Sequence, residues 1–471
     1  MSLLGLGVLL LAGKVVRIKS GLSQRLFLPS SIIAGVIGLL IGPSVLGAVV
    51  QRRAGEEHPL AGGLLPEPVL EVWSALPELL INVVFATLFL GIALPGWRKI
   101  WELAGPQLSF GVTLGAGQYV VGLLLAVIVL TPLFGMNPMA GALIEIGFEG
   151  GHGTAAGLAG TLEELDFPEG GDLALGVATV GVVSGIVIGV ALINWGVRNG
   201  RAAVLDEPSE VSEAQQKGII EYDGRVPAGE MTVRPESIEP LSYHFSFVAI
   251  AIFIGVILLE ALILLEANTW GAWTGTELLT HVPLFPLAML GGVVVQLVMR
   301  RVDRHDLLDR ETMLRIQGFA LDLLIATAIA TLSLEVIGAN LVPFVLLAVA
   351  GIAWNVLLFL FLAPRVIPDF WFERAVGDLG QSMGVTATGL VLIKIADPSG
   401  ESPAMESFGY KQLGFEPFLG GGLLTGISAP LIFQFGPLPL LGFMTVLTAA
   451  AAIVGLRVFG RDRAGVVSRG G

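Results

Sequence analysis

Two glycine-rich segments carry the residues whose types and spacing could bind ions. The first contains Glu149-Gly-Gly-His-Gly-Thr154 within the apolar stretch 138–160, and the second contains Asp378-Leu-Gly-Gln-Ser-Met-Gly384 within 375–396. Glycine permits sharp turns with positive φ and lets backbone amides approach a ligand closely. Residues after Gly153 favour a helix, whose positive N-terminal end would suit a carboxylate. The second segment offers carbonyl, amide and hydroxyl oxygens, which are hard ligands appropriate to an alkali cation.

Few ionisable side chains lie inside apolar stretches, and an unpaired charge there costs at least about 2.5–3.5 kcal/mol on insertion scales. These residues are therefore candidates for function. The residues that we expect to bind the cation are Glu149, Asp322, Asp378, Gln381 and Ser382. Asp322 has an alternative role as an ion-pair partner of Arg315. His152 has an alternative role as a capping donor to backbone carbonyls, and no second ligand at suitable spacing makes it a metal ligand.

The composition indicates that these two segments lie within a membrane protein. The chain has 471 residues, of which 54% are hydrophobic and 14% charged, whereas soluble domains carry about 25% charged residues. The absence of cysteine excludes disulfides and thiolate chemistry. The net charge of −13 argues against nucleic-acid binding. The sequence also lacks a nucleophile–base set and an HExxH motif, which argues against an enzyme.

Apolar stretches of about 20 residues can cross a hydrocarbon core about 30 Å thick as helices. We therefore predict an all-α polytopic membrane protein with about 11 transmembrane helices and two re-entrant hairpins. The predicted spans lie near 2–18, 27–50, 79–95, 104–131, 173–197, 245–266, 280–299, 316–337, 340–363, 416–435 and 437–459.

The hairpins follow from the distribution of Lys and Arg, which the cytoplasmic side retains. Lys14 and Arg17 place the first loop inside and the N-terminus outside. Arg198 then lies inside only if 138–160 returns to the face from which it enters. The basic residues at the C-terminus lie inside only if 375–396 does the same. The C-terminus is therefore expected inside the cell.

The two halves of the chain look related. Thr154-Ala-Ala-Gly-Leu158 matches Thr386-Ala-Thr-Gly-Leu390, and Phe27-Leu-Pro29 with Gly35 parallels Leu284-Phe-Pro286 with Gly292. Gln118 and Asn355 both fall in the middle of the span that precedes a hairpin. Each half has an odd number of spans, so the second copy is inverted, as in many secondary transporters. The predicted divisions are a first repeat at 1–200, an acidic cytoplasmic linker at 201–240, a second repeat at 241–435, and an extra helix with a basic tail at 436–471.

Gly150-Gly-His-Gly-Thr154 resembles the re-entrant signature of the bacterial sodium/glutamate symporters. Phe89-Leu-Gly91 and Leu28-Pro-Ser-Ser-Ile-Ile-Ala-Gly35 also resemble the early helices of that family. The second hairpin departs from the pattern, because Gln381-Ser-Met-Gly384 replaces a Gly-Gly pair. The resemblance implies a secondary carrier with an inverted repeat and two re-entrant loops, generally a homodimer with a scaffold and a moving part. It implies substrate contacts at Gly151, His152, Gly153, Thr154, Thr386 and Thr388.

These observations together predict a carrier in a bacterial inner membrane that couples inward Na⁺ movement to uptake of glutamate, a small anionic amino acid. Na⁺ is the coupling ion and no other cofactor is expected. One alternative is a carrier of another organic anion, such as a hydroxycarboxylate, or a Na⁺/H⁺ exchanger that uses Asp322 and Asp378. A channel should show charged rings or a repeated filter loop, and the sequence has neither.

Overall fold

The computed structural model describes residues 2–26, 28–92, 97–204, 217–274, 279–398 and 400–460. Within these ranges the chain forms helices and no strand, which confirms the all-α class. Residues 205–216 of the predicted linker and 461–471 of the predicted basic tail lie outside the described ranges.

Ten helical segments among the described residues are long and apolar enough to cross a membrane. This confirms a multi-pass membrane protein with about the predicted number of spans. The segments are Ser30–Ala54, Glu67–Ala86, Leu103–Phe134, Gly170–Arg198, Pro240–Trp273, Leu284–Val302, Arg310–Ala330, Leu341–Val366, Trp371–Ala396 and Pro437–Phe459.

Three predicted spans differ in the structure. The helix predicted at 79–95 occupies Glu67–Ala86 instead, and the prediction missed its first half because acidic residues and Pro77 interrupt the apolar run. The stretch 416–435 becomes a helix only at Leu423, after a turn that contains three successive glycines. The helix Ser2–Lys19 is not among the ten candidates, because three of its 18 residues are basic.

The chain divides into two compact units, and each draws elements from both halves of the sequence. Unit 1 comprises residues 1–94, 156–164 and 212–338, and unit 2 comprises 95–155, 165–211 and 339–471. The elements of unit 1 are α1 (Ser2–Lys19), α2 (Gly21–Arg25), α3 (Ser30–Ile41), η1 (Pro43–Gly47), α4 (Ala48–Ala54), α5 (Glu67–Ala86), α10 (Ala159–Glu164), η4 (Tyr222–Gly224), α13 (Pro240–Asn268), α14 (Trp270–Thr274), η5 (Leu279–His281), α15 (Leu284–Val302), α16 (Arg310–Ala330) and α17 (Leu334–Ala339).

The helices of unit 1 pack in matching pairs. Helix α1 packs on α3 and α13 packs on α15, while α3 lies against α16 and α15 lies against α5. Glycines set two of these contacts. A Cβ at Gly35 of α3 would lie 3.0 Å from the carbonyl oxygen of Ala326 in α16, and one at Gly292 of α15 would collide with the carbonyl oxygen of Ala86 in α5. Gly35 and Gly292 are the residues that the sequence pairs, and each contacts a helix of the opposite half.

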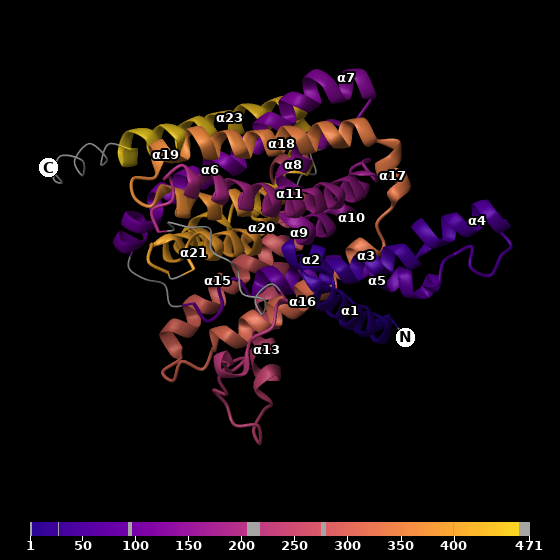
Figure 1. Ribbon diagram of the computed structural model, residues 1–471, viewed down its shortest axis with the longest axis horizontal. Coiled ribbons are helices and arrows are strands. Elements are labelled where there is room, and N and C mark those ends of the chain that lie inside the picture. The colour runs from indigo at the N-terminus through magenta and orange to yellow at the C-terminus, as the bar shows by residue number, and fades with distance from the viewer. Residues whose placement is uncertain are drawn as a thin grey trace. The chain divides into compact units, whose positions relative to one another are not determined.

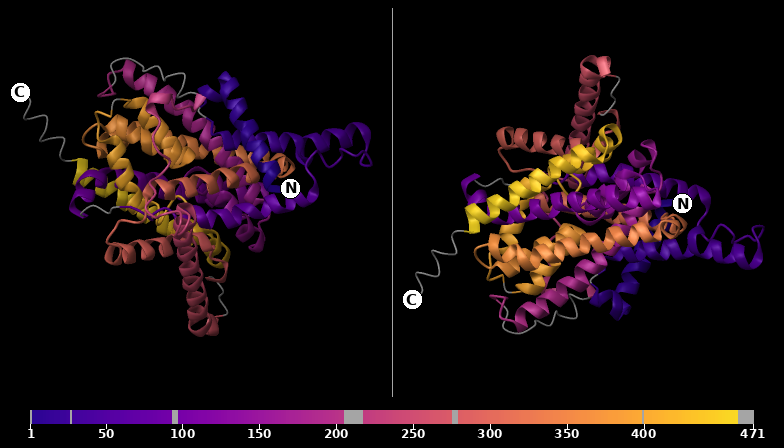
Figure 2. Two further views of the ribbon diagram at one scale, coloured as in Figure 1. Left: turned by 90° about the horizontal axis from the view of Figure 1, so that it is seen from below. Right: turned by 90° about the horizontal axis from the view of Figure 1, so that it is seen from above.

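Unit 2 contains the two glycine-rich segments. Its elements are α6 (Trp97–Leu125), η2 (Ala126–Leu130), α7 (Thr131–Phe134), η3 (Pro138–Ala142), α8 (Leu143–Phe148), the start of α9 (Gly151–Gly157), α11 (Gly170–Arg198), α18 (Leu341–Phe361), α19 (Ala363–Val366), α20 (Trp371–Ala396), α21 (Ala404–Phe415), α22 (Leu423–Phe435), α23 (Pro437–Val454) and η6 (Gly455–Phe459). Helix α6 packs against both α18 and α23 (Figures 1 and 2), and α11 packs against α8 and α20.

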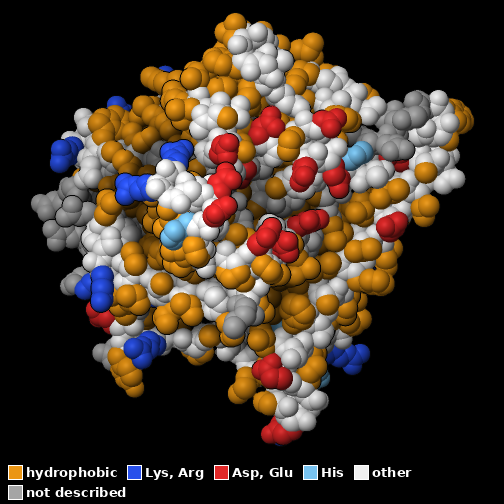
Figure 3. Space-filling model, turned by 90° about the vertical axis from the view of Figure 1, so that its right-hand side faces the viewer, with side chains coloured by type: hydrophobic (Ala, Val, Ile, Leu, Met, Phe, Trp, Pro, Cys, Tyr) orange, Lys and Arg blue, Asp and Glu red, His pale blue; other side chains and the backbone are white. Residues whose placement is uncertain are grey.

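Many large hydrophobic side chains remain exposed, as a lipid-facing surface requires. In α13, Phe253 is 64% exposed and Leu264 is 61% exposed. Orange hydrophobic side chains cover much of the face drawn in Figure 3, and acidic side chains gather in one region of it. The acidic side chains on this face are therefore concentrated in one region, and much of the rest of the face is apolar.

The part of the linker from residue 217 onward is anchored to unit 1. Lys14 Nζ donates a hydrogen bond to the carbonyl of Gly218 at 2.6 Å. The amide of Glu230 donates to Asp309 Oδ2 at 3.0 Å, and Thr232 Oγ1 donates to the carbonyl of Leu307 at 2.7 Å. The linker predicted at 201–240 thus has hydrogen-bond partners in unit 1 at Gly218, Glu230 and Thr232.

Candidate functional site

A break in the helical backbone separates α8 from α9 at the first glycine-rich segment. Glu149 and Gly150 lie between the two helices, and Gly151 has a φ of +68°. A side chain at position 151 would be strained by this backbone and would also collide with Val385. Glycine is therefore required at Gly151 for two independent reasons.

Helix α20 is broken in the same way at the second segment. Gly384 has φ −151° and ψ 38°, and Val385 has φ 63° and ψ 172°. A β-branched residue with positive φ is an outlier that surrounding structure must stabilise. The side chain of Val385 contacts Gly151, so the two breaks meet inside unit 2. The 26 residues of α20 could span about 39 Å, and its return as a hairpin stays a prediction.

Two buried amides hold the break of α20. Gln118 Nε2 in α6 and Asn355 Nδ2 in α18 each donate to the carbonyl oxygen of Ser382 at 2.7 Å. Gln118 Nε2 also lies 3.2 Å from Asn355 Oδ1. Both side chains are fully buried. They are the two residues that the sequence places at matching positions before each glycine-rich segment, and the structure brings them together.

Glu149 joins the two breaks. Its Oε1 accepts a hydrogen bond from Ser382 Oγ at 2.5 Å. Its second carboxylate oxygen, Oε2, is buried and has no partner among the described residues. An acceptor left in this state inside a protein costs about 1–3 kcal/mol, and more when it is charged. Glu149 therefore presents a carboxylate oxygen that a bound cation would satisfy.

Glu145 lies one turn earlier, and each of its carboxylate oxygens has a hydrogen-bond donor. Its Oε2 accepts from Tyr119 Oη at 2.7 Å, and its Oε1 accepts from Gly420 N and Thr425 Oγ1, both at 2.8 Å. The side chain is fully buried. Gly420 has a φ of +68°, so this glycine forms the turn before α22.

Asp378 forms an ion pair that the sequence does not reveal. Lys411 Nζ in α21 lies 2.8 Å from Asp378 Oδ1 and 2.6 Å from Gln381 Oε1. Both side chains of the ion pair are fully buried. Lys411 escaped prediction because no apolar span covers 404–415. The available signal was the spacing of Ala404, Phe408, Lys411 and Phe415, which places the lysine on the apolar face of a short helix.

The predicted substrate contacts lie around the same breaks. His152 Nε2 lies 3.0 Å from Thr179 Oγ1, while Thr154 Oγ1 is buried and has no partner among the described residues. Thr386 Oγ1 donates to Glu416 Oε1 at 3.1 Å, and Thr388 Oγ1 donates to the carbonyl of Gly384 at 2.5 Å. Helix α9 has only seven residues, so its amides rather than a long helix dipole would attract an anion.

Asp322 lies in a different unit from the other candidates. It belongs to α16 of unit 1, and its side chain is exposed. Arg315, its alternative partner, lies 3.2 Å from Glu311 instead. The geometry of the two breaks thus does not include Asp322, and its role as an ion ligand stays a prediction.

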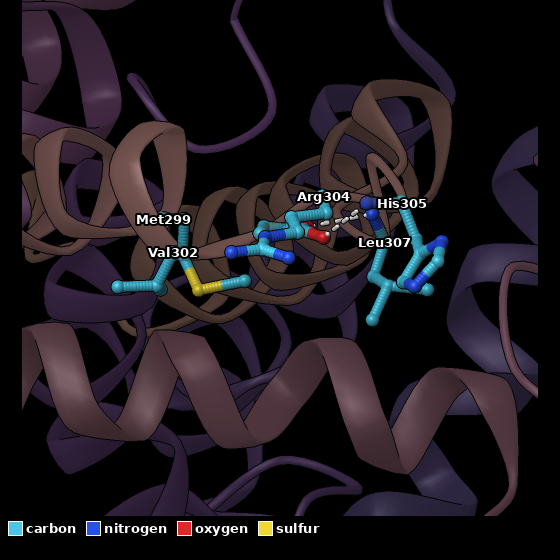
Figure 4. A pocket seen from close by; sticks show the side chains of 6 residues that line it. Met299, Val302, Arg304, His305 and Leu307 are labelled. Atoms are coloured by element: carbon cyan, nitrogen blue, oxygen red, sulfur yellow. Dashed lines mark hydrogen bonds between the residues drawn. The ribbon is translucent and has the colours of Figure 1, made fainter.

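The remaining geometry limits the kind of ion that the site could hold. Within the described ranges, no three His, Asp or Glu side chains converge as a metal centre would require. An ion at the breaks would need hydroxyl and carbonyl oxygens as well as Glu149. A pocket of about 320 Å³ lies elsewhere, in unit 1, between Met299, Val302, Arg304, His305 and Leu307 (Figure 4), and contains none of these groups.

Two broken helices that meet within a bundle of membrane-spanning helices, with buried carboxylates beside them, are the arrangement of many secondary transporters. The sequence model of the sodium/glutamate symporter family matches residues 70–395. The chain belongs to the sodium/glutamate symporter family. Its function is Na⁺-coupled transport of glutamate, and the family does not favour a hydroxycarboxylate carrier or a Na⁺/H⁺ exchanger. No curated protein and no solved structure matches the chain.

Proposed function

We propose that the meeting of the two breaks in unit 2 is the site at which Na⁺ and glutamate bind. The observation that carries this proposal is the Glu149 carboxylate, which accepts from Ser382 across the breaks at 2.5 Å and keeps Oε2 free. Na⁺ would bind to this oxygen, to the Ser382 hydroxyl, and to carbonyl oxygens freed at the breaks. The predicted ligands Asp378 and Gln381 lie on the preceding turn of α20, where Lys411 Nζ contacts an oxygen atom of each.

Glutamate would bind at the start of α9. The amides at the start of α9, from Gly151 to Gly153, would donate to a carboxylate of the substrate, and the unpartnered hydroxyl of Thr154 would donate to it as well. His152 would orient that turn through its contact with Thr179. Thr386 and Thr388 would contact the substrate from the second break. The carboxylate of the substrate would thus lie close to the coupling ion, whose charge would favour its binding.

Alternating access would follow from movement of one unit relative to the other. Each unit contains helices from both sequence halves, and the exchange of contacts by Gly35 and Gly292 in unit 1 supports an inverted repeat. The protein would lie in a bacterial inner membrane as a homodimer, with the N-terminus outside and the C-terminus inside. The linker at 201–240 would then lie in the cytoplasm.

Uptake of labelled glutamate into proteoliposomes tests the proposal. We expect inward Na⁺ gradients to drive accumulation and equal K⁺ gradients to drive none. Glu149→Gln should shift the dependence on Na⁺ to higher concentrations, whereas Glu163→Gln, at an exposed carboxylate of α10, should leave it unchanged. Equal uptake in the two gradients would refute Na⁺ coupling, and normal Na⁺ dependence in Glu149→Gln would refute the assignment of the site.

A further inference from the structure

The buried side chain of Lys411, beside the breaks, has contacts that resemble those of a bound cation. The Lys411 ammonium is held by Asp378 Oδ1 at 2.8 Å and Gln381 Oε1 at 2.6 Å. It also lies 4.5 Å from the ring centre of Phe415 and 5.1 Å from that of Phe408. Carboxylate, amide oxygen and aromatic faces are the groups that stabilise a desolvated monovalent cation.

The fold makes room for this lysine. A Cβ at Gly111 of α6 would lie 3.1 Å from Lys411 Nζ, 3.2 Å from its Cδ and 3.4 Å from its Cε. One turn further along α6, a Cβ at Gly115 would lie 3.3 Å from Glu149 Oε1. Two glycines on one face of the helix thus admit the lysine stem and the Glu149 carboxylate side by side.

The lysine changes the charge of the proposed ion site. Gln381 accepts from Lys411, and the next residue, Ser382, donates to Glu149. The lysine charge is therefore held by Gln381 of α20, next to Ser382. Ser382 in turn contacts the Glu149 carboxylate, which is free to bind an ion. Arg374, a buried cation of α20 itself, is paired with Asp369 at 2.5 Å. Removing the charge of Lys411 would leave one more uncompensated negative charge inside the membrane, where such a charge is costly.

We propose that the Lys411 ammonium occupies a cation site of the transporter, so that Lys411 determines how many Na⁺ ions accompany glutamate. This inference rests on the proposed Na⁺ site. Asp378 and Gln381 would bind a Na⁺ ion if the lysine were absent, and the lysine takes that place permanently. The position lies beyond residues 70–395, which are the part matched to the family.

A purely structural role makes a different prediction. Replacing a buried ion pair by neutral groups of similar volume is often neutral or stabilising, whereas removing one partner destabilises strongly. Either effect changes the amount of folded protein. Neither effect changes the number of Na⁺ ions that each transport cycle requires. The Na⁺ dependence of uptake therefore separates the two roles.

The experiment measures the initial rate of glutamate uptake against Na⁺ concentration in proteoliposomes at pH 8.5. Wild type is measured first, and absence of Na⁺-dependent uptake there would refute the proposed function and not this inference. For Lys411→Gln we expect a Hill coefficient for Na⁺ about one higher than in wild type, because one more charge needs compensation. The control Lys394→Gln, at an exposed lysine of α20, should keep the wild-type value.

A second pair of variants keeps the test decisive if Lys411→Gln does not fold. Asp378→Asn should lower the Hill coefficient by about one, because the lysine then compensates a second charge of the site. Adding Lys411→Gln to Asp378→Asn should restore the wild-type value. A Hill coefficient that stays at the wild-type value in Lys411→Gln, or in both Asp378→Asn and the double variant, would overturn the proposal.

Discussion

Substitution of Gly151 by alanine tests whether the two helix breaks contact each other. The backbone at Gly151 has a φ of +68°, and an L-residue in this region costs about 1–2 kcal/mol. The new Cβ would also collide with the side chain of Val385, and such overpacking costs about 1–3 kcal/mol more. We therefore expect Gly151→Ala to lower the free energy of unfolding by about 2–5 kcal/mol.

Gly135 supplies a matched control for the backbone cost. Its φ of +67° is almost the same, but a Cβ there would meet nothing within 4 Å. Gly135→Ala should therefore cost only about 1–2 kcal/mol. The difference between the two variants measures the collision with Val385. Reversible denaturation in lipid–detergent micelles gives both free energies.

A double-mutant cycle then identifies the partner. Val385→Ala removes the atoms that an alanine at Gly151 would strike, so the double variant should recover about 1–3 kcal/mol relative to the sum of the single effects. It should also recover Na⁺-driven glutamate uptake in part. If Gly151→Ala costs no more than Gly135→Ala, or if the two substitutions are additive, the breaks do not meet and the proposed site loses its geometry.

Three further predictions concern carboxylates. Glu149→Gln should raise the Na⁺ concentration for half-maximal uptake by about 10- to 100-fold, because it removes a charged ligand worth about 1.5–3 kcal/mol; an unchanged value would contradict its role. Glu145→Gln should destabilise the protein by roughly 2–4 kcal/mol, because it weakens three hydrogen bonds. The variant that still folds should keep the wild-type Na⁺ dependence of uptake. A changed Na⁺ dependence without a loss of stability would contradict a structural role for Glu145. Burial would raise the pKa of Asp309, but hydrogen bonds from Thr312 and the amide of Glu230 hold it below its ordinary value. The ionised carboxylate therefore stabilises the folded state at neutral pH. Asp309→Asn should lower the free energy of unfolding by about 0.5–2 kcal/mol, and this loss should become smaller only below about pH 4. A loss that already becomes smaller between pH 7 and 5 would contradict this role of Asp309.

The sequence predicts the helical class and most spans, because long apolar runs are sufficient evidence of membrane helices. The prediction fails where polar or glycine residues do not mark the true end of a helix. Glu71 and Glu78 lie on the exposed side of α5, so a helix continues through residues that read as a loop. Position 423 begins α22 only after the turn at Gly420–Gly422, and no composition rule distinguishes such glycines from those that pack helices.

The site was predictable where it depends on local backbone and unpredictable where it depends on packing. The glycines around Gly151 mark a break without any knowledge of the fold, since they permit what other residues resist. Lys411 carries no local mark of function, because a lysine in a short polar helix usually points to water. Its burial follows from α21 lying against α6 at Gly111, a contact between residues 300 positions apart in the chain.

The contact between Gln118 and Asn355 bears on the inverted repeat more directly than sequence similarity does. Residues at equivalent positions of a two-fold arrangement can touch each other only near the axis, and these two lie 3.2 Å apart. They share one acceptor, Ser382 O, so the arrangement is symmetric in its donors and asymmetric in its acceptor. The offset between Thr154 and Thr386 is 386 − 154 = 232, and the same offset relates Glu149 to Gln381. A carboxylate thus stands in one half where an amide stands in the other, so Glu149 has no second carboxylate at the equivalent position of α20.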